Sequence, residues 1–222
     1  FRAEVPDDLV VETDPGKLSG IVSNLLENAV SYGRPGSEVR CTASREGTRF
    51  CLEVANAADP LAPEDLSRLA EPFWRKDTAR ASADHAGLGL ALVCALAGLL
   101  RMDVRFAGFE TFDELRHYCA HAADPVGHLV LYLFGHGDAE RQARSNDICT
   151  ALQLTNFWQD LAIDLRKGRI YLPREDMARF GYAPDDLGRH AVTPAFRELM
   201  AFQCGRARGL FERGLALVGM LD

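Results

Sequence analysis

Residues 153–173, QLTNFWQDLAIDLRKGRIYLP, carry the most informative pattern in the chain. The side chains Gln153, Asn156, Asp160 and Asp164 are three, four and four residues apart, so they line one face of a helix. Hard cations such as Mg²⁺ bind carboxylate and amide oxygens and hold diphosphates through them. The pattern therefore predicts a magnesium–diphosphate site, and the alternative is the solvated face of an amphipathic helix.

The residues around this helix favour a site over a solvated face. Phe157 and Trp158 flank the polar stripe, which indicates a helix that is buried on most sides. Lys167, Arg169 and Tyr171 follow at once and bring cationic and hydroxyl groups to the helix end. We therefore expect these three side chains near any bound diphosphate.

The same stretch resembles the second aspartate-rich motif of squalene and phytoene synthases, which join isoprenyl diphosphates head to head. Residues 111–135, TFDELRHYCAHAADPVGHLVLYLFG, are similar to the tyrosine-containing helix of that family and the turn after it. The bacterial, hopanoid-linked branch is the nearest in appearance. The resemblance implies an all-α, isoprenoid-synthase-like helical fragment over residues 107–222, built around an apolar cavity.

The resemblance also implies roles for the residues of the motif. Asp160 and Asp164 would hold Mg²⁺ on a prenyl diphosphate, while Arg169 and Tyr171 would contact the diphosphate or the carbocation. Gln153, Asn156 and Lys167 would assist in binding the diphosphate. The family also needs a first aspartate-rich helix that faces the second, and this chain offers none, so we expect little or no condensation by the chain alone.

Residues 1–106 differ in texture, because strands and helices alternate there. Residues 38–56 predict a hairpin, and residues 102–106, MDVRF, predict a last short strand. Four clusters follow one another: NLLENA at 24–29, VAN at 54–56, EPFWRKD at 71–77 and HAGLGL at 85–90. Each is a weak signal alone, since paired amides on a helix are usually surface residues and a single GxG seldom marks a phosphate site.

In this order the clusters resemble the ATP-binding catalytic domain of sensor histidine kinases. The resemblance implies an α+β two-layer sandwich that binds Mg²⁺ and ATP, with Asn28 as the magnesium ligand. It implies a phospho-acceptor histidine domain that acts in trans or is missing from this chain. The other nucleotide-binding residues that it implies are Asn24, Tyr32, Asn56, Phe73, Arg75, Gly87, Leu88 and Gly89.

Composition and charge exclude several classes of protein. The formal net charge is −7, which argues against a nucleic-acid-binding protein. The longest uncharged apolar stretch, residues 86–100, is shorter than the roughly 20 residues of a membrane span, so we expect no transmembrane segment. No two of the six cysteines form a CxxC pair, which favours free thiols in a cytoplasmic protein, with the inner face of the membrane as an alternative location.

Three functional hypotheses remain open. The first joins a histidine-kinase ATP-binding module, residues 1–106, to a partial head-to-head prenyl synthase, residues 107–222. The second is a prenyltransferase of the squalene/phytoene synthase type, which condenses prenyl diphosphates with Mg²⁺. The third is a non-catalytic composite of two incomplete domains.

Overall fold

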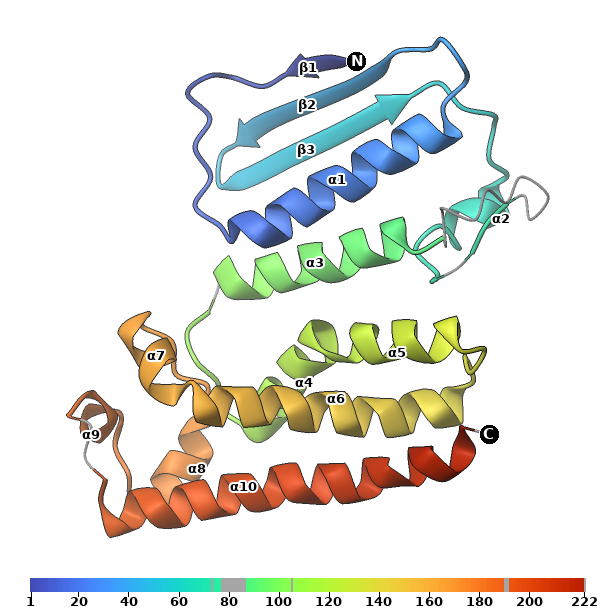
Figure 1. The fold of residues 1–222 in the computed structure, drawn as a ribbon. Coiled ribbons are helices and arrows are strands. Elements are labelled where there is room, and N and C mark those ends of the chain that lie inside the picture. The colour runs from blue at the N-terminus through green and yellow to red at the C-terminus, as the bar shows by residue number, and fades with distance from the viewer. Residues whose placement is uncertain (73, 77–86, 105, 190–191, 222) are drawn as a thin grey trace. The chain divides into compact units, whose positions relative to one another are not determined.

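A computed structural model describes residues 1–72, 74–76, 87–104, 106–189 and 192–221 (Figure 1). Contacts between residues divide the chain into two compact units, Phe1–Val104 and Arg105–Asp222. Each unit buries its own set of apolar side chains, Ile21 and Leu99 among them in the first, Leu115 and Leu154 in the second.

The first unit contains a three-stranded sheet and two long helices. Strands β1, β2 and β3 lie in that order; β1 is parallel to β2, and β2 and β3 form an antiparallel hairpin that turns at Gly47. Gly47 has a φ of 61°, a conformation that glycine adopts without steric cost. The elements are β1 (Arg2–Glu4), α1 (Pro15–Tyr32), β2 (Val39–Glu46), β3 (Arg49–Asn56), α2 (Pro63–Leu66) and α3 (Gly89–Val104).

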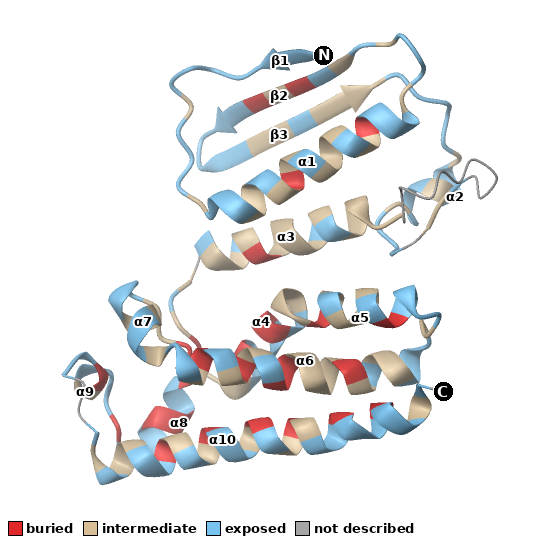
Figure 2. Ribbon diagram, viewed as in Figure 1, coloured by how far each residue is buried: buried red, intermediate tan, exposed pale blue. Residues whose placement is uncertain are grey.

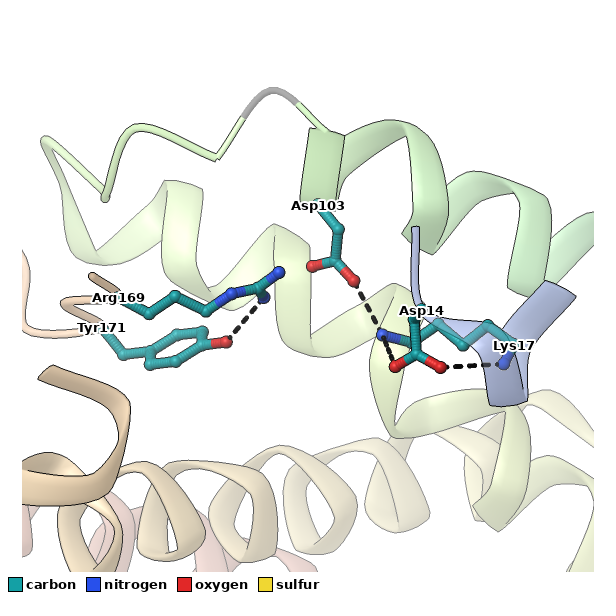
Figure 3. Close-up of polar contacts among 5 residues, drawn as sticks. All are labelled: Asp14, Lys17, Asp103, Arg169 and Tyr171. Carbon is teal, nitrogen blue, oxygen red and sulfur yellow. Dashed lines mark hydrogen bonds and ion pairs between the residues drawn. The ribbon is translucent and has the colours of Figure 1, made fainter. Parts of the chain in front are cut away.

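A buried ion pair joins the two long helices of this unit. Asp14 caps α1 by accepting a hydrogen bond from the Lys17 backbone N–H at 3.0 Å. The Lys17 ammonium reaches Asp103 of α3 at 2.7 Å, and the Asp103 side chain is only 8% exposed (Figure 3). Burial by itself lowers the pKa of Lys17, but the Asp103 and Asp14 carboxylates together outweigh it and raise that pKa above its ordinary value.

The regular secondary structure in the described residues of the second unit is all helical. Helix α6 is its centre, because α4, α5 and α10 all pack against it. The buried positions of α10 lie along the side that faces α6 (Figure 2). The elements are α4 (Phe112–Ala122), α5 (Asp124–Leu133), α6 (Ala139–Gln159), α7 (Leu161–Arg166), α8 (Arg174–Arg179), α9 (Pro184–Gly188), α10 (Pro194–Gly214) and the 3₁₀ helix η1 (Leu215–Met220).

A glycine sets the distance between α5 and α6. A Cβ atom added at Gly127 would lie 2.3 Å from Ser145 Oγ and 2.5 Å from Cys149 Sγ, which is far too close for any real contact. The two helices therefore approach each other closely at a point where a side chain is missing.

The fold class expected for residues 1–106 is wrong. The chain is mostly helical, and its described strands are one of three residues and two of eight, too little sheet for an α+β sandwich of the histidine-kinase type. The strand expected at 102–106 is also wrong up to Val104, because α3 continues through Met102, Asp103 and Val104. The Lys17–Asp103 ion pair anchors that last turn to α1, so tertiary contact overrides the short alternating pattern.

Candidate functional site

The polar stripe lies at the junction of α6 and α7, where the expected single helix is interrupted. Asp160 has φ −92° and ψ 8°, so it ends α6 and precedes α7. The helical bonding nevertheless continues, because Asp160 N–H donates to Asn156 O at 2.8 Å and Asp164 N–H donates to Asp160 O at 2.9 Å. The two carboxylates thus remain one turn apart, and we call this pair, Asp160 and Asp164, the aspartate turn.

The side chains of the stripe differ in exposure and in partners. Gln153 is half-buried, whereas Asn156 and Asp160 are exposed. The Asp164 side chain is 14% exposed, and Lys167 Nζ lies 3.6 Å from its Oδ1 atom. The Asp160 carboxylate makes no hydrogen bond or ion pair with any part of the chain that the structure describes. One carboxylate is therefore held by a lysine, and the other is open to a ligand.

The chain turns sharply after α7 and brings Arg169 and Tyr171 together. Gly168 has a φ of 71°, and the next N–H, that of Arg169, donates back to Asp164 O at 2.9 Å. Arg169 Nη1 donates to the Tyr171 hydroxyl at 3.1 Å (Figure 3). Arg169 is thereby tied at its backbone to the aspartate turn and at its side chain to Tyr171.

Tyr171 stands in a cluster of aromatic rings that we call the aromatic wall. It is 6% exposed and stacks on Phe157 with 3.8 Å between ring centroids and 6° between planes. Phe106 and Phe109 lie 5.2 and 6.1 Å from it, and the Arg169 guanidinium lies 5.2 Å from the Phe106 centroid. The members are Phe106, Phe109, Tyr118, Phe157 and Tyr171. Aromatic faces attract cations, so the wall suits a site where positive charge develops.

The sequence predicted only part of this arrangement. It named Tyr171 as a functional residue and placed Phe157 beside the stripe, but it did not name Phe106, Phe109 or Tyr118. The one available signal was Tyr118, the tyrosine of the tyrosine-containing helix. Phe106 and Phe109 reach the wall from a segment without helix or strand, and no periodicity marks such residues.

The donor groups fit a magnesium ion that arrives with a diphosphate. Within the described ranges, no group of three His, Cys, Asp or Glu side chains could hold a metal by itself. Mg²⁺ commonly binds through one or two carboxylates and takes phosphate oxygens and waters as its other ligands. The aspartate turn supplies two such carboxylates. His117 and His121 are a less suitable pair, because His121 Nδ1 already bonds to His117 O at 2.9 Å.

The first unit brings together three other predicted residues, which we call the Asn28 cluster: Asn24, Asn28 and Gly89. A Cβ atom added at Gly89 would lie 2.9 Å from Asn28 Nδ2 and 3.3 Å from Asn24 Oδ1. Asn24 Nδ2 donates to Gly20 O at 2.7 Å, and Asn28 Nδ2 is buried without a partner among the described residues. The cluster is thus a contact between α1 and the start of α3.

The other residues predicted to bind a nucleotide lie in different structural settings. Tyr32 is half-exposed at the end of α1, and Asn56 ends β3. Arg75 has a buried Nε atom without a partner in the described part of the chain. Gly87 has a φ of 71° and Leu88 precedes α3, whereas Phe73 lies outside the described residues.

No helix among the described residues is long and apolar enough to cross a bilayer.

Comparison with protein families gives one match over most of the chain. The family model described as squalene/phytoene synthase matches residues 46–222. A phytoene synthase from Thermus thermophilus is 40% identical over 111 residues, which is 50% of this chain and 38% of that protein. One from Arthrospira platensis is 37% identical over 132 residues, 52% of this chain and 43% of that protein. The chain thus spans less than half the length of these relatives.

Two solved structures are similar in fold. The squalene synthase HpnC of Alicyclobacillus acidocaldarius superimposes with a TM-score of 0.58 and 39% identity, over 60% of this chain and 51% of that one. A dehydrosqualene synthase crystallised with a ligand gives 0.54 and 26%, over 71% of this chain and 59% of that one. Both matches cover more residues than the second unit alone contains.

These matches overturn the kinase interpretation of the front of the chain. The family match extends from residue 46, inside the segment that the kinase resemblance had taken, to residue 222. The similar folds are those of isoprenoid synthases rather than of a kinase ATPase. ATP and a phospho-acceptor histidine domain therefore have no support as cofactor and partner.

Proposed function

Because the chain belongs to the squalene/phytoene synthase family, we propose that its second unit binds the diphosphate of a prenyl diphosphate with Mg²⁺ and contributes to head-to-head prenyl transfer. One observation carries the proposal. The aspartate turn, with one carboxylate held by Lys167 and the other open, is hydrogen-bonded through Arg169 to a tyrosine inside the aromatic wall. A polar anchor and a cation-stabilising surface are thus contiguous.

Asp160 and Asp164 would hold the magnesium ion, which supplies Lewis-acid charge that neutralises the diphosphate. Lys167 and Arg169 would place two positive charges beside the same anion, while Gln153 and Asn156 would offer hydrogen bonds to its oxygens. Lys167 is 63% exposed at its side chain, so it can turn from Asp164 to a ligand at little cost.

Tyr171 and the aromatic wall would act on the other end of the scissile bond. When a diphosphate leaves a prenyl carbon, the carbon becomes electron-poor, and ring faces stabilise such charge while keeping water away. The Tyr171 hydroxyl accepts a hydrogen bond from Arg169, which fixes the ring and its oxygen beside the diphosphate anchor.

The prenyl chain needs apolar surface, and α5 offers it. Val126, Val130, Leu133 and Phe134 are between 49% and 75% exposed, and α5 packs directly on α6. Exposed apolar side chains in such number are characteristic of a binding surface. We propose that the hydrocarbon lies along these side chains.

Calorimetry of the purified chain tests the proposal. Inorganic pyrophosphate and farnesyl S-thiolodiphosphate should each bind in the presence of Mg²⁺ and bind at least tenfold more weakly when EDTA replaces it. The double variant Asp160→Asn, Asp164→Asn should lose the magnesium dependence, because amide oxygens are weaker ligands for this ion. Glu140→Gln, an exposed change at the far end of α6, is the matched control. Equal binding by the double variant and the wild type would refute the proposed site.

A further inference from the structure

The segment of residues 106–111 carries two rings of the aromatic wall but has no helix or strand to hold its shape. Gly108 within it has a φ of 82°, and α4 begins only at Phe112. Phe106 and Phe109 therefore depend on contacts from elsewhere for their positions beside Tyr171 and Arg169.

The first turn of α8 supplies those contacts. Arg174 N–H donates to Phe109 O at 2.9 Å, and Glu175 N–H donates to Glu110 O at 3.0 Å. The Arg174 guanidinium donates to Ala107 O at 2.9 Å and also pairs with the Glu110 carboxylate. Two consecutive residues of α8 thus bind three residues of the segment beyond Phe106: Ala107, Phe109 and Glu110.

Glu175 adds a second kind of contact, at the start of α4. Its Oε1 atom accepts a hydrogen bond from the Phe112 N–H at 2.7 Å. The first N–H groups of a helix have no partner within the helix and attract negative charge, so this carboxylate fixes the end of the segment as well as its middle.

A buried polar cluster anchors α8 itself. The Asp176 side chain is 3% exposed and accepts hydrogen bonds from Gln203 Nε2 at 2.8 Å and from the Arg206 guanidinium. Arg206 lies 4.1 Å from the Phe112 ring centroid and 4.4 Å from that of Phe202. Buried charges that are paired in this way are costly to separate, so α8 is a firm base for the contacts that it makes.

We propose that Arg174 and Glu175 are positioning residues, whose side chains hold the backbone at Ala107, Glu110 and Phe112, keep Phe106 and Phe109 in the aromatic wall and thereby set the affinity of the site for the prenyl part of its ligand. The inference rests on the proposed function. It also predicts a division of labour. The aspartate turn and Lys167 bind the diphosphate whether or not the wall is in place, whereas the prenyl part needs the wall.

The test compares two ligands on the same variants. Calorimetry with Mg²⁺ measures inorganic pyrophosphate and farnesyl S-thiolodiphosphate on the wild type, on the double variant Arg174→Ala, Glu175→Ala, and on Glu175→Gln. The amide oxygen of Glu175→Gln can still accept from Phe112 N–H, so it is the conservative control. The double variant should bind the farnesyl ligand about tenfold more weakly, the effect of about 1.4 kcal/mol, and pyrophosphate within about twofold of the wild type. Glu175→Gln should match the wild type for both.

Each other outcome is informative. Equal loss of both ligands would show a merely structural role and overturn the proposal, as would unchanged affinity for the farnesyl ligand. If the wild type bound neither probe, the proposed function would fail by itself. Hydrogen exchange at the Phe112 amide would then decide the contact: about tenfold faster exchange in the double variant supports positioning by α8, and an unchanged rate overturns it.

Discussion

The aspartate turn and the two asparagines of the Asn28 cluster each place two oxygen-bearing side chains four residues apart, yet the two pairs differ in what surrounds those side chains. Asn24 is already bonded to Gly20 O, and Asn28 is covered by the start of α3 at Gly89. Among the described residues, the Asp160 carboxylate has no partner, and the Asp164 carboxylate has only an exposed lysine.

The contrast between the two pairs shows why residue spacing alone does not identify a binding site. In the Asn28 cluster a glycine is needed because the backbone of α3 approaches an asparagine closely. A glycine required by packing thus gives the same sequence pattern as a phosphate-binding loop. At the aspartate turn, packing does not fully cover either carboxylate. The two cases are separated by whether a motif residue is already bonded or covered by packing within the fold.

The largest expected change in the free energy of unfolding is at the aromatic wall. Tyr171→Ala should lower the free energy of unfolding of the second unit by about 3 kcal/mol, because a buried ring stacked on Phe157 is lost. Tyr171→Phe keeps the ring and should cost less than about 1 kcal/mol, the hydrogen bond from Arg169. Urea denaturation measures both. Equal costs for the two variants would show that the hydroxyl, and not the stack, stabilises the wall.

A second prediction concerns Asp124, a buried carboxyl of the second unit. Burial raises its pKa from 3.8 to about 6, while the hydrogen bond from Thr150 and the charge of His128 oppose that rise and the Asp147 carboxylate adds to it. The folded state thus binds the proton more tightly than the unfolded state does. The contribution of Asp124 to stability is then greatest below pH 4, falls as pH rises from about 4 to 6, and stays low above that.

The measurement is the difference in unfolding free energy between Asp124→Asn and the wild type at several pH values. This difference should favour the variant increasingly from pH 4 to pH 6, by at most about 3 kcal/mol. The exposed change Asp185→Asn should show no such trend. A difference that does not vary with pH would contradict the raised pKa.

The stabilisation by the Lys17–Asp103 ion pair of the first unit should change with pH in the alkaline range, whereas that of Asp124 changes in the acidic range. Asp103 raises the pKa of Lys17, so its stabilisation is complete at neutral pH and is lost only as pH rises past the ordinary value of 10.5. Lys17→Met should cost about 1 kcal/mol at pH 7, because the buried Asp103 carboxylate loses the charge-assisted hydrogen bond from Lys17. Thermal denaturation of Lys17→Met beside Lys76→Met, an exposed lysine, measures it. No difference between the two would show that the pair does not join α1 to α3.

The smallest effect is expected at the Asn28 cluster. Adding Mg²⁺ and an ATP analogue should not raise the melting temperature of the chain, and Asn28→Ala should change the unfolding free energy by less than about 1 kcal/mol. The buried Asn28 Nδ2 atom has no partner to lose among the described residues. An ATP-dependent rise that Asn28→Ala abolishes would give the Asn28 cluster a ligand after all.

The sequence predicted the second unit better than the first for a physical reason. The apolar residues of α6 and α10 recur at helical spacing, so those long helices are visible without tertiary information. The alternating pattern at 102–106 predicted a strand, but α3 continues to Val104 because Asp103 contacts Lys17, which lies far away in sequence. Short segments lack the local signal to resist such contacts.

The site divides in the same way. Asp160, Asp164, Arg169 and Tyr171 lie within twelve residues, so their proximity could be predicted from spacing, although their roles remain predictions. The break at Asp160 and the arrival of Phe106 and Phe109 depend on backbone geometry and on α8, which spacing does not encode.

The close approach of α5 to α6 at Gly127 constrains how this protein can evolve. Any side chain at position 127 would need room that both Ser145 and Cys149 now occupy, so a substitution there requires both of those side chains to rotate away or to become smaller. In lineages that keep this helix pair, a change at position 127 should therefore follow changes at positions 145 and 149.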